Sequence, residues 1–227
     1  MSAKQPILIV APHPDDETLG CGGILGIKSK AGVDVHVAVL SDGSMLFAAL
    51  FGTGTSPSPQ EVSALRKKET ERTVAFLGGN SDYIHYFDFL DGTLSAQIDL
   101  VSDRLASLID ELQPAEIYTP DPYEQHPDHV AANTIAKAAL KKSNVDAILL
   151  EYFLALKNGM SFADIPGHIV EVDLGEFYAL KKQALTFFDL HHKIVLPQQT
   201  EPLITDNFES YLDRVERFIV DTPLPSI

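Results

Sequence analysis

The chain has 227 residues, of which 45% are hydrophobic, and this is enough to bury the core of one large α/β domain. Lys and Arg number 17 against 32 Asp and Glu, so the formal net charge is −15. A surface this negative repels phosphate groups, which excludes general nucleic-acid binding and docking on anionic lipid as expected functions.

The apolar runs of the chain are short. Leu46 to Phe51 is among the longest, and it falls far below the roughly 20 residues that cross a bilayer. The first run, Ile7 to Ala11, leads into carboxylates and lacks the pattern of a secretory signal. Cys21 is the single cysteine, so no internal disulfide can form. We therefore expect a cytoplasmic protein without a membrane span.

Strand and helix patterns alternate along the chain. Apolar runs and period-two alternation predict strands, and longer periodic segments ended by Gly or Pro predict helices. In chain order we expect strand 7–11, helix 18–30, strand 33–40, helix 61–77, strand 82–89, helix 94–112, strand 116–119, helix 129–142, strands 147–154 and 168–174, and helices 177–188 and 208–218.

Helices that cross over between short apolar strands imply a mostly parallel sheet with helices on both faces. The predicted fold class is α/β, a Rossmann-like single domain over residues 1–227. Ligands of such sheets bind at the carboxyl ends of the strands. The long loop at residues 44–59 has apolar side chains that suit either a hydrophobic part of a substrate or packing on the core or a subunit interface.

Two clusters of polar side chains follow predicted strands. His13-Pro14-Asp15-Asp16-Glu17 comes directly after strand 7–11, and His126-Pro127-Asp128-His129 comes after strand 116–119. Both clusters therefore fall where a parallel sheet places its ligands. Imidazole and carboxylate are common zinc ligands, and a hydrolytic zinc needs about three protein ligands and an open position for water. His13, Asp16 and His129 can form such a triad.

The remaining polar residues of the clusters suit the chemistry around a metal. A carboxylate beside the metal can act as general base, and Asp15 is our candidate, although the residues alone do not fix which aspartate is ligand and which is base. His126 can stabilise the oxyanion that forms at a carbonyl. Asp128 can fix the tautomer of His126 or of another imidazole by a hydrogen bond.

Each cluster also has a purely structural interpretation. Acidic residues after a strand often cap the next helix, and Asp128 could be the N-cap of the second helix. His36 and His85 lie within predicted strands and are expected to be packing residues, whereas His191 and His192 follow a helix and could reach the site. The G-x-G-x-x-G spacing of a dinucleotide site is absent.

The two motifs together resemble those of the LmbE-like (PIG-L) family of zinc-dependent N-deacetylases. The likeness begins at Ala11 and runs through Gly23, continues through Leu40-Ser41-Asp42-Gly43 and Asp91-Gly92, and includes His126 to His129. That family includes enzymes that deacetylate N-acetylglucosaminyl-phosphatidylinositol and the sugar precursors of mycothiol and bacillithiol. The resemblance implies a zinc-dependent deacetylase acting on an N-acetylglucosamine-type sugar or glycoconjugate.

The resemblance also implies residue roles. His13, Asp16 and His129 would bind zinc, Asp15 would be the base and His126 would stabilise the oxyanion, while Arg66 would lie near the substrate. Two departures concern specificity: Glu124 stands where some members have a tyrosine, and His191-His192 replace a Ser-Gln pair that follows a motif matched by Lys181, Ala184 and Leu185.

Three alternatives stay open from the sequence. A larger amide conjugate could be the substrate, a non-catalytic metal-binding module could keep the same fold, and the chain could form a homo-oligomer. The complete set of polar residues in both motifs favours the deacetylase, because a decayed site would be expected to lose its base.

Overall fold

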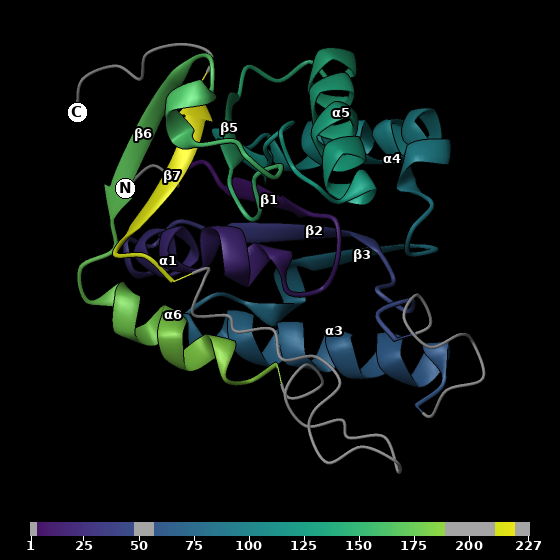
Figure 1. Cartoon of the computed structure of the whole chain (residues 1–227), viewed down its shortest axis with the longest axis horizontal. Coiled ribbons are helices and arrows are strands. Elements are labelled where there is room, and N and C mark those ends of the chain that lie inside the picture. The colour runs from purple at the N-terminus through teal and green to yellow at the C-terminus, as the bar shows by residue number, and fades with distance from the viewer. Residues whose placement is uncertain (1–3, 48–56, 189–211, 221–227) are drawn as a thin grey trace.

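A seven-stranded sheet organises the part of the chain that the computed structural model describes, which is residues 4–47, 57–188 and 212–220 (Figure 1). The strands are β1 (Ile7–Ala11), β2 (Val35–Ser41), β3 (Ile84–Phe89), β4 (Glu116–Pro120), β5 (Ile148–Tyr152), β6 (His168–Asp173) and β7 (Val215–Val220). The α-helices are α1 (Asp16–Lys30), α3 (Pro59–Phe76), α4 (Ile98–Leu112), α5 (Pro127–Lys142) and α6 (Phe177–Leu185).

The order of the strands places a switch point in the middle of the sheet. The order is β3-β2-β1-β4-β5-β7-β6, and the first five strands are parallel, whereas β7 is antiparallel to both β5 and β6. The chain winds from β1 towards β3 and then returns to place β4 on the other side of β1. Connections leave β1 and β4 in opposite directions, and open α/β sheets commonly bind their ligands at the carboxyl ends of the strands beside such a switch point.

Helices cover both faces of the sheet, as predicted. Figure 1 shows α1, α3 and α6 on one side and α4 and α5 on the other. Strand β1 is buried throughout because its alternate residues enter two cores: Ile7, Ile9 and Ala11 pack on the side of α1, and Leu8 and Val10 on the side of α4 and α5. This burial explains why the strand is a continuous apolar run.

The structure corrects one predicted element. Residues 208–218 were predicted to be helical, but in the described part of this segment Val215–Val220 form β7, which pairs with both β5 and β6. Pairing on both edges outweighs the weak helical periodicity of such a short segment, as tertiary context commonly does. The other predicted helices and strands are present, with ends that shift by a few residues. Among the described helices, none combines the length and apolar character needed to cross a membrane.

Glycines in α1 allow neighbouring elements to approach its backbone closely. A Cβ added at Gly20 would lie 2.3 Å from Cδ2 of Tyr152, and one at Gly26 would lie 2.4 Å from Cδ1 of Phe177. Cys21, which lies between these glycines, is fully buried. The glycine-rich run of α1 therefore reflects close packing and not a phosphate-binding loop.

We predict that Gly20→Ala destabilises the fold by about 1–3 kcal/mol, because the new methyl group would overlap a buried ring. Tyr152 is fully buried and its hydroxyl donates to the carbonyl of Val10 at 2.9 Å, so the ring cannot move aside freely. Urea unfolding measures the effect. Ser107→Ala on the exposed face of α4 is the control, and equal stability of the two variants would contradict the prediction.

Candidate metal and active site

The turn between β1 and α1 gives two adjacent aspartates different surroundings. Asp15 has φ of 132°, a backbone conformation that is unusual for a residue other than glycine. Asp15 occupies the N-cap position of α1, but its side chain makes no capping hydrogen bond. Instead its backbone N–H donates to Oε2 of Glu17 at 3.0 Å. The capping interpretation of this motif therefore does not describe Asp15.

Arg66 of α3 holds the side chain of Asp15. The Nη2 group of Arg66 lies 3.0 Å from Oδ2 of Asp15 and donates to the carbonyl of Pro14 at 3.0 Å, while Nη1 donates to the carbonyl of Gly43 at 2.9 Å. Both side chains are buried. Arg66 thus joins α3 to the loops after β1 and β2, and its place near a substrate stays a prediction.

Asp16 points towards two imidazoles from different parts of the chain. Its Oδ2 lies 3.1 Å from Nδ1 of His13 and 3.4 Å from Nε2 of His129, and those two nitrogens lie 3.2 Å apart. The backbone N–H of His13 also donates to Oδ2 of Asp16 at 2.9 Å. The structure therefore brings together the three residues predicted to be metal ligands, at the carboxyl ends of the adjacent strands β1 and β4.

These three atoms fit a small divalent cation. Zinc binds nitrogen and oxygen ligands at about 2.0–2.2 Å in a tetrahedral arrangement, which places its donor atoms roughly 3.3–3.6 Å apart. Of the three distances, 3.4 Å lies within that range, and 3.1 and 3.2 Å lie just below it. One carboxylate and two imidazoles also match a ligand set that catalytic zinc sites use.

Carboxylates lie behind both imidazoles. Nε2 of His13 is 3.2 Å from Oδ1 of Asp91 and 3.5 Å from Oδ2 of Asp128, while Nδ1 of His129 is 3.4 Å from Oε2 of Glu124. A carboxylate that accepts a hydrogen bond from one ring nitrogen keeps the proton on that nitrogen. The other ring nitrogen, which faces Asp16, is then free to bind a metal. Asp128 was predicted to fix the tautomer of His126 or of another imidazole, and in the structure the imidazole nitrogen that its carboxylate faces is Nε2 of His13.

The local charges favour a cation at this position. Although burial opposes it, the carboxylates around His13 hold the pKa of that imidazole well above its usual range, and Asp16 likewise raises the pKa of His129 to about 9. Burial acts against ionisation of Asp16 too, but His129 and His13 keep the pKa of its carboxyl well below normal. A divalent metal would replace protons on these imidazoles.

Asp15 and Asp16 also differ in pKa. Burial raises the pKa of Asp15 to about 6, although the positive charge of Arg66 acts in the opposite direction. A carboxylate with a pKa slightly below neutral is largely ionised at pH 7 and still able to accept a proton. The environment of Asp15 is therefore the one expected of a general base.

His126 lies beside the two ligand imidazoles and is more exposed than either. Its ring centroid is 4.8 Å from that of His13 and 4.9 Å from that of His129. It is the N-cap of α5, because its Nδ1 accepts a hydrogen bond from the backbone N–H of Asp128 at 3.2 Å. Burial lowers the pKa of His126, and the neighbouring imidazoles lower it further. A neutral ring whose Nδ1 is an acceptor carries its proton on Nε2, so His126 presents an N–H donor.

Asp91 and Glu124 belong to this site but were not predicted as functional residues. Asp91 follows β3 and accepts a hydrogen bond from the backbone N–H of Met45 at 3.0 Å, in addition to its contact with His13. Glu124 is almost fully buried and accepts from the backbone N–H groups of Leu154 and Ala155 at 2.9 and 2.6 Å. Asp91 lies directly before Gly92 at the end of a predicted strand, which was the available signal, whereas Glu124 was noted only as a departure from a family pattern.

Parts of two sequence predictions lie outside the described residues. These are the central part of the loop at 44–59, including Leu50 and Phe51, and the pair His191 and His192. In the described part of the loop, Phe47 is buried, which agrees with the packing interpretation for that residue. His36 and His85 lie away from the motifs on β2 and β3 and contact each other at 3.0 Å between ring nitrogens.

Comparison with known proteins finds similarity over the part of the chain that carries both motifs. The family model described as PIG-L, GlcNAc-PI de-N-acetylase, matches residues 8–140, which is more than half of the chain and includes both motifs. A diacetylchitobiose deacetylase of Thermococcus kodakarensis is 34% identical over 126 residues, covering 54% of this chain and 44% of the relative. A probable N-acetyl-alpha-D-glucosaminyl L-malate deacetylase 2 of Bacillus cereus is 32% identical over 130 residues, covering 56% and 57%.

A solved structure extends the likeness to the fold. The N,N'-diacetylchitobiose deacetylase of Pyrococcus horikoshii superimposes with a TM-score of 0.62 at 26% identity, covering 81% of this chain and 69% of that one. The chain spans about half the length of the curated relatives it matches. The match therefore concerns the domain that carries the motifs.

We predict that Arg66→Met lowers the free energy of unfolding by on the order of 3 kcal/mol, because it leaves the buried carboxylate of Asp15 without its charged partner. Denaturant unfolding measures this difference. Arg72→Met changes an exposed arginine on the same helix and is the control. If both variants unfold alike, the ion pair does not hold this part of the structure.

Proposed function

The chain belongs to the PIG-L family, and on that premise we propose that it is a zinc-dependent deacetylase. Its reaction would be hydrolysis of the amide of an N-acetylglucosamine-type sugar or glycoconjugate, which gives acetate and a free amine. The observation that carries the proposal is the meeting of His13 Nδ1, Asp16 Oδ2 and His129 Nε2 within 3.4 Å of one another, with Asp15 adjacent to Asp16 in the chain.

The three convergent side chains would hold the metal. A bound zinc ion supplies Lewis acidity, which polarises a carbonyl and lowers the pKa of a coordinated water towards about 7. The chain contributes the fixed orientation of its ligands, since Asp91 and Asp128 hold His13 and Glu124 holds His129. Such supporting carboxylates keep each imidazole in its metal-binding tautomer.

Asp15 is the group we assign to proton transfer. Its carboxylate would accept a proton from the attacking water as the new C–O bond forms at the amide carbon. The same proton would then pass to the amide nitrogen as the C–N bond breaks, so the amine leaves as a neutral molecule and Asp15 returns to its ionised form. Arg66 would act through Asp15 by holding its carboxylate and would not itself contact the reacting atoms.

His126 is the group we assign to the oxyanion. Its Nε2–H is available because Nδ1 already accepts from the backbone of Asp128. A hydrogen bond from this donor strengthens as negative charge develops on the carbonyl oxygen, and donors of this kind commonly contribute about 10²–10³ in rate. The exposure of His126 suits contact with a substrate. No tyrosine is required for this role, which accords with Glu124 at the position where some relatives have one.

The substrate is expected to be small and without strong negative charge. The net charge of −15 disfavours phosphorylated or otherwise anionic partners. Two of the relatives are named for diacetylchitobiose and for a glucosaminyl malate, of which the first is neutral. Location in the cytoplasm and the oligomeric state stay predictions from the sequence.

A panel of N-acetylated sugars tests the proposal. We expect release of acetate from at least one member, such as N-acetylglucosamine or diacetylchitobiose, with loss of activity after treatment with a chelator and recovery on addition of zinc. If activity returned with another divalent metal and not with zinc, that metal would replace zinc in the proposal. Release from none of the sugars would instead favour a larger amide substrate or a metal-binding module without turnover.

Two substitutions separate the assigned roles. Asp15→Asn is expected to retain zinc but to lose about 10²–10⁴ in kcat, because the amide cannot accept the proton. His13→Ala is expected to lose zinc, measured by elemental analysis of the purified protein. Stoichiometric zinc in the His13 variant would refute the ligand assignment, and full activity of the Asp15 variant would refute the base assignment. His168→Ala, on the distant strand β6, is the control.

A further inference from the structure

Helix α1 is broken a short distance after the residues that form the site. Cys21 has φ of −131° and ψ of 15°, which lie outside the helical range, and the segments on each side of it are helical. Asp16 lies on the first segment, one turn before the break. The direction of this short segment therefore decides where the Asp16 carboxylate points.

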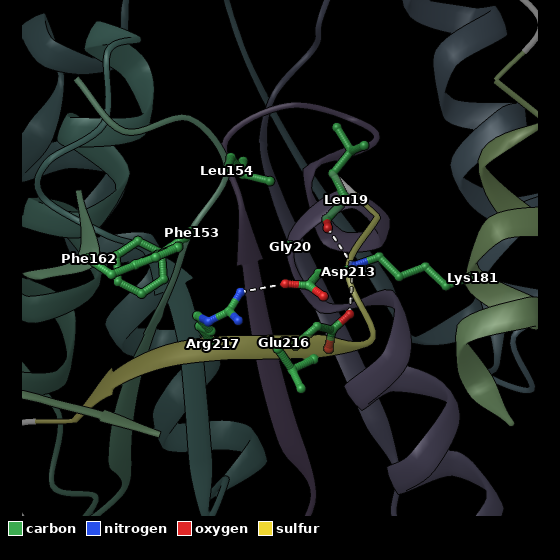
Figure 2. Close-up of a pocket in the computed structure, with 10 residues that line it drawn as sticks. Leu19, Gly20, Phe153, Leu154, Phe162, Lys181, Asp213, Glu216 and Arg217 are labelled. Atoms are coloured by element: carbon green, nitrogen blue, oxygen red, sulfur yellow. Dashed lines mark hydrogen bonds and ion pairs between the residues drawn. The ribbon is translucent and has the colours of Figure 1, made fainter. Parts of the chain in front are cut away.

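A buried ion pair occupies the break. Lys181 of α6 and Glu216 of β7 lie 2.7 Å apart between Nζ and Oε1, and both are almost fully buried. Lys181 donates to the carbonyl of Leu19 at 2.7 Å (Figure 2). Glu216 accepts from the backbone N–H of Gly23 at 2.7 Å and from that of Ile24 at 2.8 Å.

These contacts involve backbone groups that a regular helix would pair with each other. In an unbroken α-helix the N–H of Gly23 donates to the carbonyl of Leu19, and that of Ile24 donates to the carbonyl of Gly20. Here the N–H of Gly23 and the carbonyl of Leu19 each have a charged side chain as partner. The ion pair thus satisfies backbone groups that would be costly to bury unpaired.

Glycine at two positions makes this arrangement sterically feasible. A Cβ at Gly22 would lie 3.2 Å from Cγ of Lys181, and one at Gly23 would lie 3.0 Å from Oε1 of Glu216 and 2.2 Å from Cδ2 of Leu174. A larger residue at position 23 would therefore overlap the side chains of Glu216 in β7 and of Leu174, which follows β6. The Gly22-Gly23 pair is explained by the contacts of this ion pair as well as by packing.

We propose that Lys181 and Glu216 are positioning residues for Asp16, since they hold the break that directs the first turn of α1 towards His13 and His129. The inference rests on the proposed function, in which Asp16 is a metal ligand. Without the pair, the first turn of α1 loses the contacts that fix its direction relative to the rest of the helix. A cavity of about 220 Å³ beside Leu19, Gly20 and Leu154 offers space for that turn to move (Figure 2).

The test compares Lys181→Met, Glu216→Leu and the double variant with the unaltered protein, each freed of metal and titrated with zinc by calorimetry. We expect all three to bind zinc about 10–100-fold more weakly, the usual effect of losing a group that orients a ligand. Lys28→Met is the matched control, because it removes another ion pair of α1, with Glu116, from the other end of the helix.

Thermal unfolding separates positioning from a purely structural role. Each single variant buries an unpaired charge and should melt at a lower temperature, whereas the double variant replaces both charges by apolar groups and should recover much of that loss. If the pair positions Asp16, zinc affinity stays low in the double variant despite the recovered stability. A double variant that binds zinc as tightly as the unaltered protein would overturn the inference.

Hydrogen exchange gives a readout that does not depend on metal. In the metal-free double variant, the amides of residues 16–20 should exchange faster than in the unaltered protein and in Lys28→Met, because the first turn has lost its anchor. Unchanged exchange would contradict the positioning role whatever the zinc titration shows. If the unaltered protein binds no divalent metal, the proposed function fails, and the exchange result still decides whether the pair holds the first turn.

Discussion

The meeting of carboxylates and imidazoles at the switch point between β1 and β4 is the constraint on which the rest of the site depends. Asp15, Asp16, Asp91, Asp128 and Glu124 all lie there with little exposure to solvent. Buried carboxylates are costly unless cations or hydrogen-bond donors offset them. Within the described part of the chain, Arg66 offsets the charge of Asp15, and His13 and His129 offset those of their neighbours. A divalent cation among His13, Asp16 and His129 would complete this balance.

The backbone of the turn after β1 separates the tasks of two adjacent aspartates. In a regular helix, the side chains of successive residues point in directions about 100° apart. The unusual φ of Asp15 instead turns its carboxylate towards Arg66, while Asp16 faces the imidazoles. The strain is retained because Arg66 and His129 hold the two side chains and Glu17 accepts from the backbone N–H of Asp15. Under the proposed function, Asp16 would bind the metal and Asp15 would transfer the proton.

Support for the site reaches into elements far from it in sequence. Glu124 connects His129 to the backbone of the segment after β5, and the Lys181–Glu216 pair connects the first turn of α1 to α6 and β7. Both connections use a carboxylate that accepts backbone N–H groups, so they fix chain segments as well as side chains. The late, antiparallel part of the sheet therefore has a structural connection to a site built from β1 and β4.

The α/β fold, most of its elements and the two motifs of the site were predictable from the chain alone, because apolar periodicity and the position of polar residues after strands are local signals. The family was predictable as well, through His13 to Glu17 and His126 to His129. Features that depend on contacts between distant segments were not predictable in this way. The segment from Val215 is a strand because β5 and β6 pair with it, Asp91 and Glu124 support the imidazoles because separate loops meet, and Lys181 fills a break in α1 that no periodicity predicts. The physical reason is that hydrogen bonds and ion pairs between remote residues are made only once the sheet has brought them together.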